Sequence, residues 1–478
     1  MIYDVSVTTE HFEYEEYKDV WDQIDDCVKG EKWVKAKRDQ YLPIPNATDL
    51  SRENAIRYNQ YLFRALFMNA TGRTLAALVG AVFSKPTKIE LPDNLQYLET
   101  NADGNGLGLD QHSRGSVEEN VKKGRHGLLV DYPATDGPVT LSQRQQGEIR
   151  PYIIRYEAQD IINWRVKKIG AVNKLCLVVL RERNENQDEF YNTELHDNYR
   201  VLWLDDDGYY NVATMNLRSG KNGDLEVNTE DTAEFQPRDA SGNLLTEIPF
   251  KFVGSKDNDY TIDEPPMYDL SNVNLSHYRN SADNEESSFI VGQPTLVLST
   301  EQSTEELLKD NPCGISIGSR SAIVLGQGDD SKLLQAEPNN LPKSNMEQKE
   351  NMMVQLGARL ATPSQNQTAE ATRINYGAET SQLSIIVSNE NEAYSDCIRW
   401  CSMFEDGNPD PDFEFKLNTN FIFESMTAQD LTAWMNGVQQ GMFAQDDLLN
   451  MMRKSGMLDE NRSNEDIIDD IDMSEPTV

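Results

Sequence analysis

Two helical patterns on either side of a strand-rich insert constrain the fold of this chain most strongly. In each pattern the side chains expected to face a core recur every three or four residues, as on one face of a helix. These side chains are Met267, Leu270, Asn274, Tyr278 and Ala282 in the first pattern, and Met346, Met353, Leu356 and Leu360 in the second. Between them, Pro294–Ser299 and Gly314–Leu325 alternate like strands, and Glu301–Lys309 is helical in pattern. Two helices joined by a small α/β insert predict a projecting hairpin with a mechanical role rather than an active-site cleft.

The chain before these helices changes from a helical to a strand period. One helix is expected around Tyr17–Val28, and a second helical region over Ser51–Phe83, which Gly72 should break or bend. The apolar side of that second region is expected to carry Ile56, Leu62, Leu66, Leu75, Leu78 and Val82. Short strands are then expected at Leu128–Asp131, Pro151–Tyr156, Ile161–Val166, Leu175–Arg181, Tyr199–Leu204, Tyr209–Met215 and Phe250–Gly254. Asp205–Gly208 has the residues of a hairpin turn between two of these strands.

The chain after the second helix begins with a polar loop. Ala361–Thr368 contains Pro363 and cannot continue a helix, whereas a helix of unusual length is expected over Ala369–Phe404. A strand at Phe413–Leu417 and two short helices around Leu431–Gly437 and Asp446–Ser455 should follow. The fold class is therefore α+β.

Charge excludes a simple nucleic-acid binder. The 478 residues carry 80 acidic and 44 basic side chains, a net charge of −36, whereas phosphate contacts require Lys and Arg. A strongly acidic surface can serve solubility alone. It also suits a surface that must not adhere to an acidic polymer passing close by.

The five cysteines are Cys27, Cys176, Cys313, Cys397 and Cys401, and only the last two are close in sequence. Such a sparse, odd set favours a reducing compartment over a disulfide framework. Cys397 and Cys401 fall on the apolar stripe of the long helix and are expected in its core. Neither a signal peptide nor an apolar run long enough for a bilayer is recognisable, so synthesis in the cytoplasm without a membrane partner is expected.

No motif of catalysis is present in the sequence. The five histidines, His11, His112, His126, His196 and His277, have no metal-ligand spacing. Asp103–Gly108 is rich in glycine but lacks the GK[ST] ending of a phosphate loop. We therefore expect no enzyme activity, cofactor or metal site.

The order of elements resembles that of the portal proteins of tailed bacteriophages, the head-to-tail connectors. Local segments that are similar to this family are Gly124–Pro133 (GRHGLLVDYP), Arg150–Val166 (RPYIIRYEAQDIINWRV), Asn274–Asp283 (NLSHYRNSAD), Leu356–Leu360 (LGARL), Thr368–Arg373 (TAEATR) and Gly441–Gly456 (GMFAQDDLLNMMRKSG). The resemblance covers roughly residues 15–460 and leaves out the extreme N-terminus and the acidic tail.

The resemblance implies a portal fold with named parts. Residues 1–266 would form the wing, 267–289 and 343–360 the two stem helices, and 290–342 the clip between them. Residues 361–368 would be the tunnel loop, 369–419 the long wing-to-crown helix with its following strand, and 420–478 a helical crown with an acidic tail. Asn274, Asn284, Ser287 and Ser288 leave the first stem helix partly polar, which is consistent with subunit contacts or exposure to a lumen.

The resemblance also implies a function. Portals form a ring, usually of about twelve subunits, at one vertex of the virion capsid. Double-stranded DNA is packaged through this channel by terminase and later ejected through it. The implied partners are further copies of the chain, the terminase large subunit, a head–tail adaptor, and the major capsid and scaffold proteins.

Three sets of residues are candidates for this function. The tunnel loop would face DNA with Ser364, Gln365, Asn366 and Gln367, whose neutral groups could contact DNA without holding it. Lys343 and Lys349 are candidate basic residues of the channel lining, although Lys343 is also spaced for an ion pair with Glu347 on the helix surface. The clip residues that could dock terminase and adaptor are Glu305, Glu306, Lys309, Asp310, Asp329 and Asp330.

Two alternatives remain at this level. Another ring-forming connector, such as an adaptor, would share the ring but is usually a much shorter chain without the helix–insert–helix core. An unrecognised hydrolase would need a catalytic cluster that the sequence does not display.

Overall fold

The computed structural model describes residues 5–133, 149–189, 192–219, 225–293, 295–299, 303–310, 330–335, 337, 339–357, 369–419, 428–440, 442–454, 458, 463–465 and 467–468. Within the described part the chain forms two compact units. The first contains residues 1–365 and 385–417, and the second contains residues 366–384 and 418–478. Each unit is described separately below.

Five helices form the N-terminal part of the first unit. They are α1 (Phe12–Lys29), α2 (Glu31–Ala36), α3 (Arg52–Arg64), α4 (Ala70–Val82) and α5 (Leu109–Lys123). The break in the second helical region lies at residues 65–69 and not at Gly72, as the sequence had indicated. Asn69 caps α4 by accepting a hydrogen bond from the Gly72 amide at 2.7 Å. A Cβ at Gly72 would lie 2.8 Å from the Val28 carbonyl, so glycine allows α4 to approach α1 closely.

Two antiparallel sheets follow these helices. The three-stranded sheet has the order β3 (Tyr152–Glu157), β2 (Arg125–Asp131) and β9 (Phe250–Gly254), and every residue of its central strand is buried. The five-stranded sheet is a meander of β4 (Ile161–Ile169), β5 (Val172–Glu189), β6 (Asn192–Leu204), β7 (Tyr210–Ser219) and β8 (Leu225–Phe235). Each strand expected between 128 and 254 has its counterpart here. Strand β8 was not expected, because its sequence, LEVNTEDTAEF, is largely polar.

The expected turn at Asp205–Gly208 joins β6 to β7. The Asp205 amide donates to the Tyr209 carbonyl at 2.9 Å, and Gly208 has a φ of +85°. This φ is one that glycine adopts without strain.

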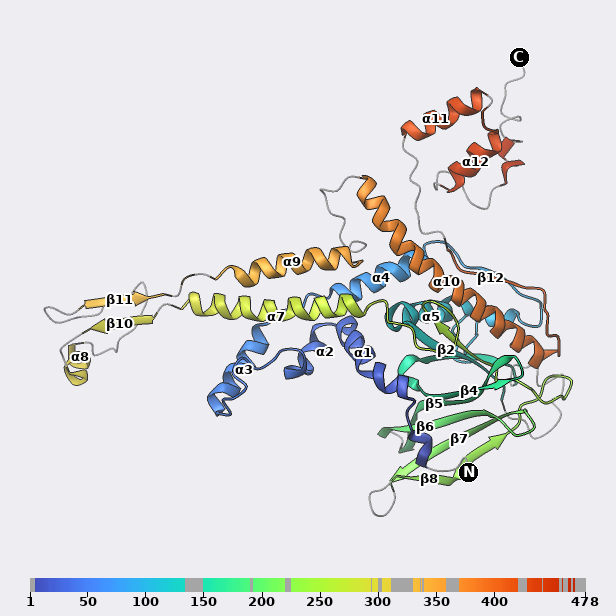
Figure 1. The fold of residues 1–478 in the computed structure, drawn as a ribbon, viewed down its shortest axis with the longest axis horizontal. Coiled ribbons are helices and arrows are strands. Elements are labelled where there is room, and N and C mark those ends of the chain that lie inside the picture. Colours follow the sequence, from blue (N-terminus) through green and yellow to red (C-terminus); the bar gives the residue numbers. More distant parts are fainter. Residues whose placement is uncertain are drawn as a thin grey trace. The chain divides into compact units, whose positions relative to one another are not determined.

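The helix–insert–helix segment follows β9. Helix α7 (Tyr268–Val291) leads into strand β10 (Thr295–Ser299) and the short helix α8 (Thr304–Asp310); strand β11 (Asp330–Leu334) then leads into α9 (Leu341–Gln355). Strands β10 and β11 pair antiparallel. The strand expected over 314–325 lies outside the described residues. Figure 1 shows α7 and α9 side by side, with the paired strands β10 and β11 beyond their ends. The segment made of β10, α8 and β11 is called the hairpin below.

The long helix is α10 (Ala369–Glu405), one residue longer than expected. Its part in the first unit buries Val387, Tyr394, Ile398 and Phe404. Cys397 and Cys401 are free and fully buried in the same core, as the sequence had predicted. Beyond it, β12 (Glu414–Lys416) pairs with β1 (Lys88–Glu90), a strand too short to be predicted from its sequence.

The second unit contains α11 (Ala428–Gln439) and α12 (Gln445–Lys454). The rings of Trp434 and Phe443 lie 4.7 Å apart between their centres and hold the connection between these helices against α11. In the described part of the chain, no helix is long and apolar enough to cross a membrane.

Candidate functional site

The antiparallel pair of α7 and α9 is the candidate functional element. Polar contacts are made along its length: the His277 Nε2 lies 3.2 Å from a carboxylate oxygen of Glu350, and the Lys349 Nζ donates to the Ser276 carbonyl at 3.2 Å. Near the hairpin, the Gln335 side chain donates to the Val291 carbonyl at 3.1 Å. Residue numbers therefore rise along α7 while those of the residues that contact it from α9 and its approach fall, as in an antiparallel pair. Pro342 in the first turn of α9 suits the start of a helix, because its missing N–H would have no partner there.

The two candidate lysines of α9 have different surroundings. Lys349 is half-buried against α7, where its ammonium also donates to Asn280. Burial, with a contribution from the nearby charge of Arg279, lowers the pKa of Lys349 from its usual 10.5. Lys343 is exposed, and among the described residues no ion pair joins it to Glu347. Only Lys343 is therefore free to present its charge away from the helix pair.

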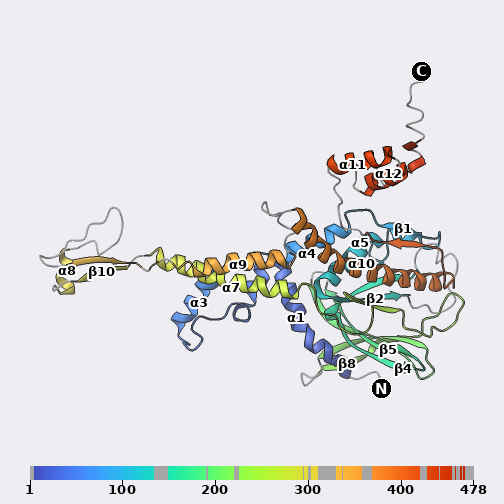
Figure 2. The same ribbon diagram turned by 45° about the horizontal axis from the view of Figure 1, so that its top comes forward.

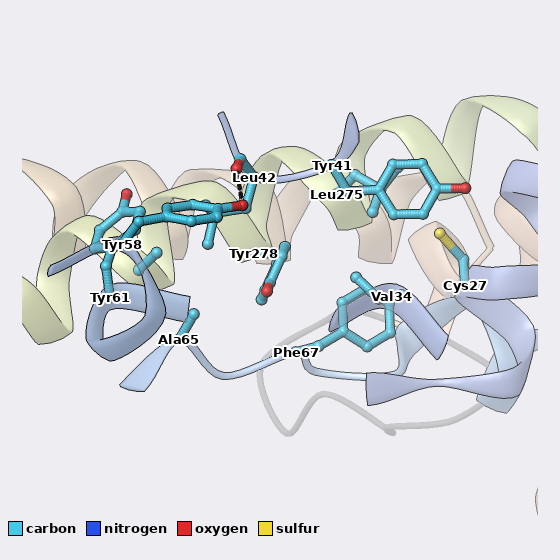
Figure 3. Close-up of a cluster of buried hydrophobic side chains, with 11 residues drawn as sticks. Cys27, Val34, Tyr41, Leu42, Tyr58, Tyr61, Ala65, Phe67, Leu275 and Tyr278 are labelled. Atoms are coloured by element: carbon cyan, nitrogen blue, oxygen red, sulfur yellow. Dashed lines mark hydrogen bonds between the residues drawn. The ribbon is translucent and has the colours of Figure 1, made fainter. Parts of the chain in front are cut away.

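The N-terminal helices pack on the face of α7 opposite to α9. Successive residues of a helix are about 100° apart, which puts Leu275, Tyr278 and Ala282 on one face and Ser276 and Asn280 on the other. The first three belong to a buried cluster whose other members are Cys27, Val34, Tyr41, Leu42, Tyr58, Tyr61, Ala65 and Phe67 (Figure 3). The second two contact α9 through Lys349. In both views α3 and α9 flank α7 from opposite sides (Figures 1 and 2).

Besides this apolar cluster, polar contacts join α3 to the segment before it and to α7. The Tyr58 hydroxyl donates to the Leu42 carbonyl at 2.8 Å, and the Tyr61 hydroxyl donates to Asp283 at 2.7 Å. Arg64 forms an ion pair with Glu286. The helix α3 is therefore held firmly beside α7 although it is only 13 residues long.

Asn274 joins α7 to the start of α4. Its side-chain oxygen accepts hydrogen bonds from the Ala70 and Thr71 amides at 3.2 and 3.1 Å, and its amide donates to the Met68 carbonyl at 2.7 Å. The side chain is completely buried within the chain. The expectation that Asn274 makes α7 polar toward a neighbouring subunit or a lumen is therefore wrong, because an amide in this position satisfies backbone groups at the end of a buried helix. The sequence carried no signal for this role.

Apolar side chains of α3 and α9 remain exposed. On α3, Ile56 and Phe63 are exposed to 48% and 83%, and Leu66 just beyond it is exposed as well. On α9, Leu341 and Met352 are exposed to 66% and 43%. Ile56, Leu66 and Leu356 had been assigned to core-facing stripes; the structure places all three at the surface. Met353 is buried as expected, and Leu360 lies outside the described residues.

The clip residues are at the surface where they are described. Glu305, Glu306 and Lys309 are exposed on α8, and Asp310 ends that helix. Asp330 is exposed on β11, with a carboxylate oxygen 3.2 Å from the Lys332 ammonium. Asp329 and the tunnel-loop residues Ser364, Gln365, Asn366 and Gln367 lie outside the described residues.

Buried titratable groups are held in structural contacts. The His112 Nδ1 lies 2.7 Å from the Tyr394 hydroxyl, and burial lowers the pKa of His112 to about 3. Burial raises the pKa of the Cys27 thiol to about 12, which suppresses its reactivity. Among the described residues no group of three or more His, Cys, Asp or Glu side chains could hold a metal ion.

Comparisons with known proteins give a partial match to a family and a structural likeness. The family model described as "Domain of unknown function (DUF4055)" matches residues 266–405, which include α7, the hairpin, α9 and α10. No curated protein matches the sequence. The chain is similar in structure to a chain of a solved structure described as "Neck of empty GTA particle computed with C6 symmetry", with 11% sequence identity and a TM-score of 0.40. That match covers 81% of this chain and 90% of the other.

Proposed function

We propose that this chain is the subunit of a portal-type connector, a ring at one vertex of a phage-like capsid through which double-stranded DNA enters and leaves. The observation that carries the proposal is the α7–hairpin–α9 segment. The α7–α9 pair is held at one end by the N-terminal helices and extends at the other into a small hairpin with exposed charged residues. Such an arrangement suits a stem with a docking clip.

The exposed apolar residues of α3 and α9 support an assembled state. A monomer would leave Phe63 and Leu341 in water, at a cost of roughly 25 cal/mol for each Å² of apolar surface. Contact with further copies in a ring would cover them. In this proposal about twelve copies surround the channel.

The charge of the chain supports passage of DNA without capture. A net charge of −36 per copy repels phosphate when part of it faces the channel. The tunnel loop, residues 361–368, would then touch DNA through neutral Ser, Asn and Gln side chains, so that contacts form and break at low cost. Lys343 is the basic residue of α9 that remains available to contact DNA in the channel.

The hairpin supports docking of partners. Glu305, Glu306, Lys309 and Asp330 present charge of both signs at the end of the stem, where terminase and then an adaptor would bind in turn. The major capsid and scaffold proteins would contact other surfaces of the ring. The chain would act by binding and positioning, without a catalytic step of its own.

Native mass spectrometry combined with electron micrographs of top views tests the proposal. A closed ring of about twelve copies with an axial opening is the expected result. A compact dimer or tetramer without an opening would overturn it. Binding of the terminase large subunit to the ring, and loss of that binding when α8 is deleted, would distinguish a portal from an adaptor.

A further inference from the structure

Each chain carries two unpartnered apolar stripes, one on each outer helix of a stack of three helices. The stack consists of α3, α7 and α9 in that order, because α3 and α9 contact opposite faces of α7. Each outer helix, α3 or α9, turns one face toward α7. Each also carries apolar side chains outside that face. Neither stripe is covered by another described element.

The first stripe follows α3. Tyr58, Tyr61 and Ala65 face α7 and are buried, whereas Ile56 and Phe63 lie seven residues apart on the other side of the helix. Leu66 extends the exposed apolar surface at the end of α3, and Arg52 precedes Ile56 by one turn. We call Ile56, Phe63 and Leu66 the α3 stripe.

The second stripe follows α9. Met353 is buried and Lys349 contacts α7, while Leu341, Met352 and Leu356 share a flank of the helix about a quarter turn away. All three of these side chains are exposed. We call them the α9 stripe. Its positions, eleven and four residues apart, are those of a seam that packs against another helix.

We propose that the α3 stripe of one copy packs against the α9 stripe of the next copy, head to tail. Two different patches, one on each outer helix of the same stack, make a heterologous interface, and repetition of such an interface closes a ring or continues as a filament. An isologous pair of α3 stripes would leave every α9 stripe uncovered. The inference rests on the proposed function for the closure of the ring.

Charge favours a second copy as the occupant. The exposed charged residues of α3 are Arg52, Glu53 and Arg57, a net charge of +1 in a chain of −36, because Arg64 is paired with Glu286 of α7. On α9 the exposed charged residues are Lys343, Glu347 and Glu350, because Lys349 is engaged with α7. The two helices thus present opposite net charge, which favours their approach over the approach of two α3 helices.

Cross-linking of two cysteine variants tests the interface directly. All variants carry Cys176→Ser and Cys313→Ser, since Cys27, Cys397 and Cys401 are buried. Full-length Phe63→Cys and Met352→Cys chains with different affinity tags are mixed and treated with a flexible bismaleimide. We expect a product that contains one chain of each kind and is absent from either variant alone. A product from Phe63→Cys alone, or no product from the mixture at the highest concentration reached, would overturn the inference.

Charge substitutions within the α3 stripe provide the second test. Ile56→Glu with Phe63→Glu should raise the concentration of half-assembly roughly tenfold or more, as expected when central apolar anchors of an interface are replaced. Val172→Glu is the matched control, since Val172 is also an exposed apolar residue but lies in the β4–β5 hairpin. Both variants should keep the circular dichroism spectrum of the unmodified chain. If the double variant half-assembles at the same concentration as the unmodified chain, the inference is overturned.

The two proposals fail in distinguishable ways. Rings with an axial opening that form equally well from the Ile56→Glu, Phe63→Glu variant would contradict this interface and leave the connector function standing. A mixed cross-link in particles without an axial opening would support the interface and overturn the connector function.

Discussion

The imidazole Nε2 of His126 lies 2.8 Å from a carboxylate oxygen of Glu390, and neither side chain has any exposed surface. His126 belongs to the buried strand β2, and Glu390 belongs to the long helix α10. Asn120 of α5 donates a hydrogen bond to the same Glu390 oxygen at 3.0 Å. One carboxylate therefore ties the long helix to both the sheet and α5.

Glu390→Ala should loosen α10 from the sheet. The substitution leaves His126 and Asn120 buried without their partner, which costs about 2–4 kcal/mol. Hydrogen exchange of the amides in residues 385–405 should show a free energy of local opening lowered by this amount. Glu392→Ala is the matched control, because Glu392 is an exposed residue of the same helix paired with Lys251. Equal effects of the two substitutions would contradict a special role for Glu390.

Tyr278→Phe should leave the chain at least as stable as before. The Tyr278 hydroxyl is buried and makes no hydrogen bond to another described residue, and burial raises its pKa well above the usual 10.0. Removing it should raise the free energy of unfolding by about 1 kcal/mol, whereas Tyr278→Ala should lower it by roughly 3–5 kcal/mol because a cavity forms beside Phe67. Urea unfolding measures both values. Loss of stability in Tyr278→Phe would show that the hydroxyl has a partner.

Periodicity predicted the helices and most strands of this chain, but it could not choose between two apolar faces of one helix. On α3, Ile56 recurs with helical spacing and was assigned to the core, yet the structure buries Tyr58 and Tyr61 instead. These tyrosines can be buried because their hydroxyls reach Leu42 and Asp283, residues distant in sequence. Partners of this kind are set by the tertiary fold and leave no local signal.

The buried face of the candidate site was predictable from the sequence, but the polar contacts that join its helices were not. The spacing of Tyr278 and Ala282 placed them correctly on the buried face of α7. Asn274 has the same spacing, but its role as a link to the backbone of α4 depends on a helix end two hundred residues earlier. The orientation of Lys349 toward α7 was equally hidden, because a lysine on a helix gives no sign of which neighbour its ammonium reaches.

Stability should fall in acid through a buried group of charged side chains on α5. Glu119 lies 2.8 Å from the Lys123 ammonium and 2.7 Å from that of Lys122. Burial alone would raise the pKa of Glu119, but these two lysines outweigh burial and hold that pKa below its usual 4.5. A carboxyl group with a lowered folded-state pKa stabilises fully above its unfolded pKa, and this contribution is lost as pH falls from 4.5 through the folded-state value.

Glu119→Gln tests this pH dependence. The variant should be less stable than the unmodified chain at pH 7 by roughly 1–3 kcal/mol, because Lys122 and Lys123 lose a buried partner. The difference should shrink as the pH falls from 4.5 through the folded-state pKa of Glu119, below which Glu119 is itself protonated in the unmodified chain. Urea unfolding at a series of pH values measures it. A difference that stays constant with pH would contradict the assignment to Glu119.

Replacement of Lys349 should affect thermal stability, whereas replacement of Lys343 should affect DNA packaging. Lys349→Ala should lower the thermal midpoint, because the hydrogen bonds from its ammonium to α7 are lost along with the packing of its stem. Lys343→Ala should leave the midpoint unchanged, since Lys343 is exposed, and should alter only the rate of DNA packaging. Differential scanning calorimetry and a packaging assay with terminase separate the two effects. A stability loss in Lys343→Ala would show that this residue also belongs to the helix pair.

Positive charge in the tunnel loop should slow packaging. In the proposed channel, neutral Gln365 and Gln367 contact DNA and release it, whereas lysines there would form ion pairs with phosphate that must break at every step. Gln365→Lys with Gln367→Lys should therefore lower the packaging rate, and the loss should diminish as salt concentration rises. Gln365→Asn with Gln367→Asn keeps the loop neutral and should package at the unmodified rate. Because only an electrostatic contact with DNA is relieved by salt, a salt-independent loss would point to a damaged loop, and an unchanged rate would exclude these residues from the DNA path.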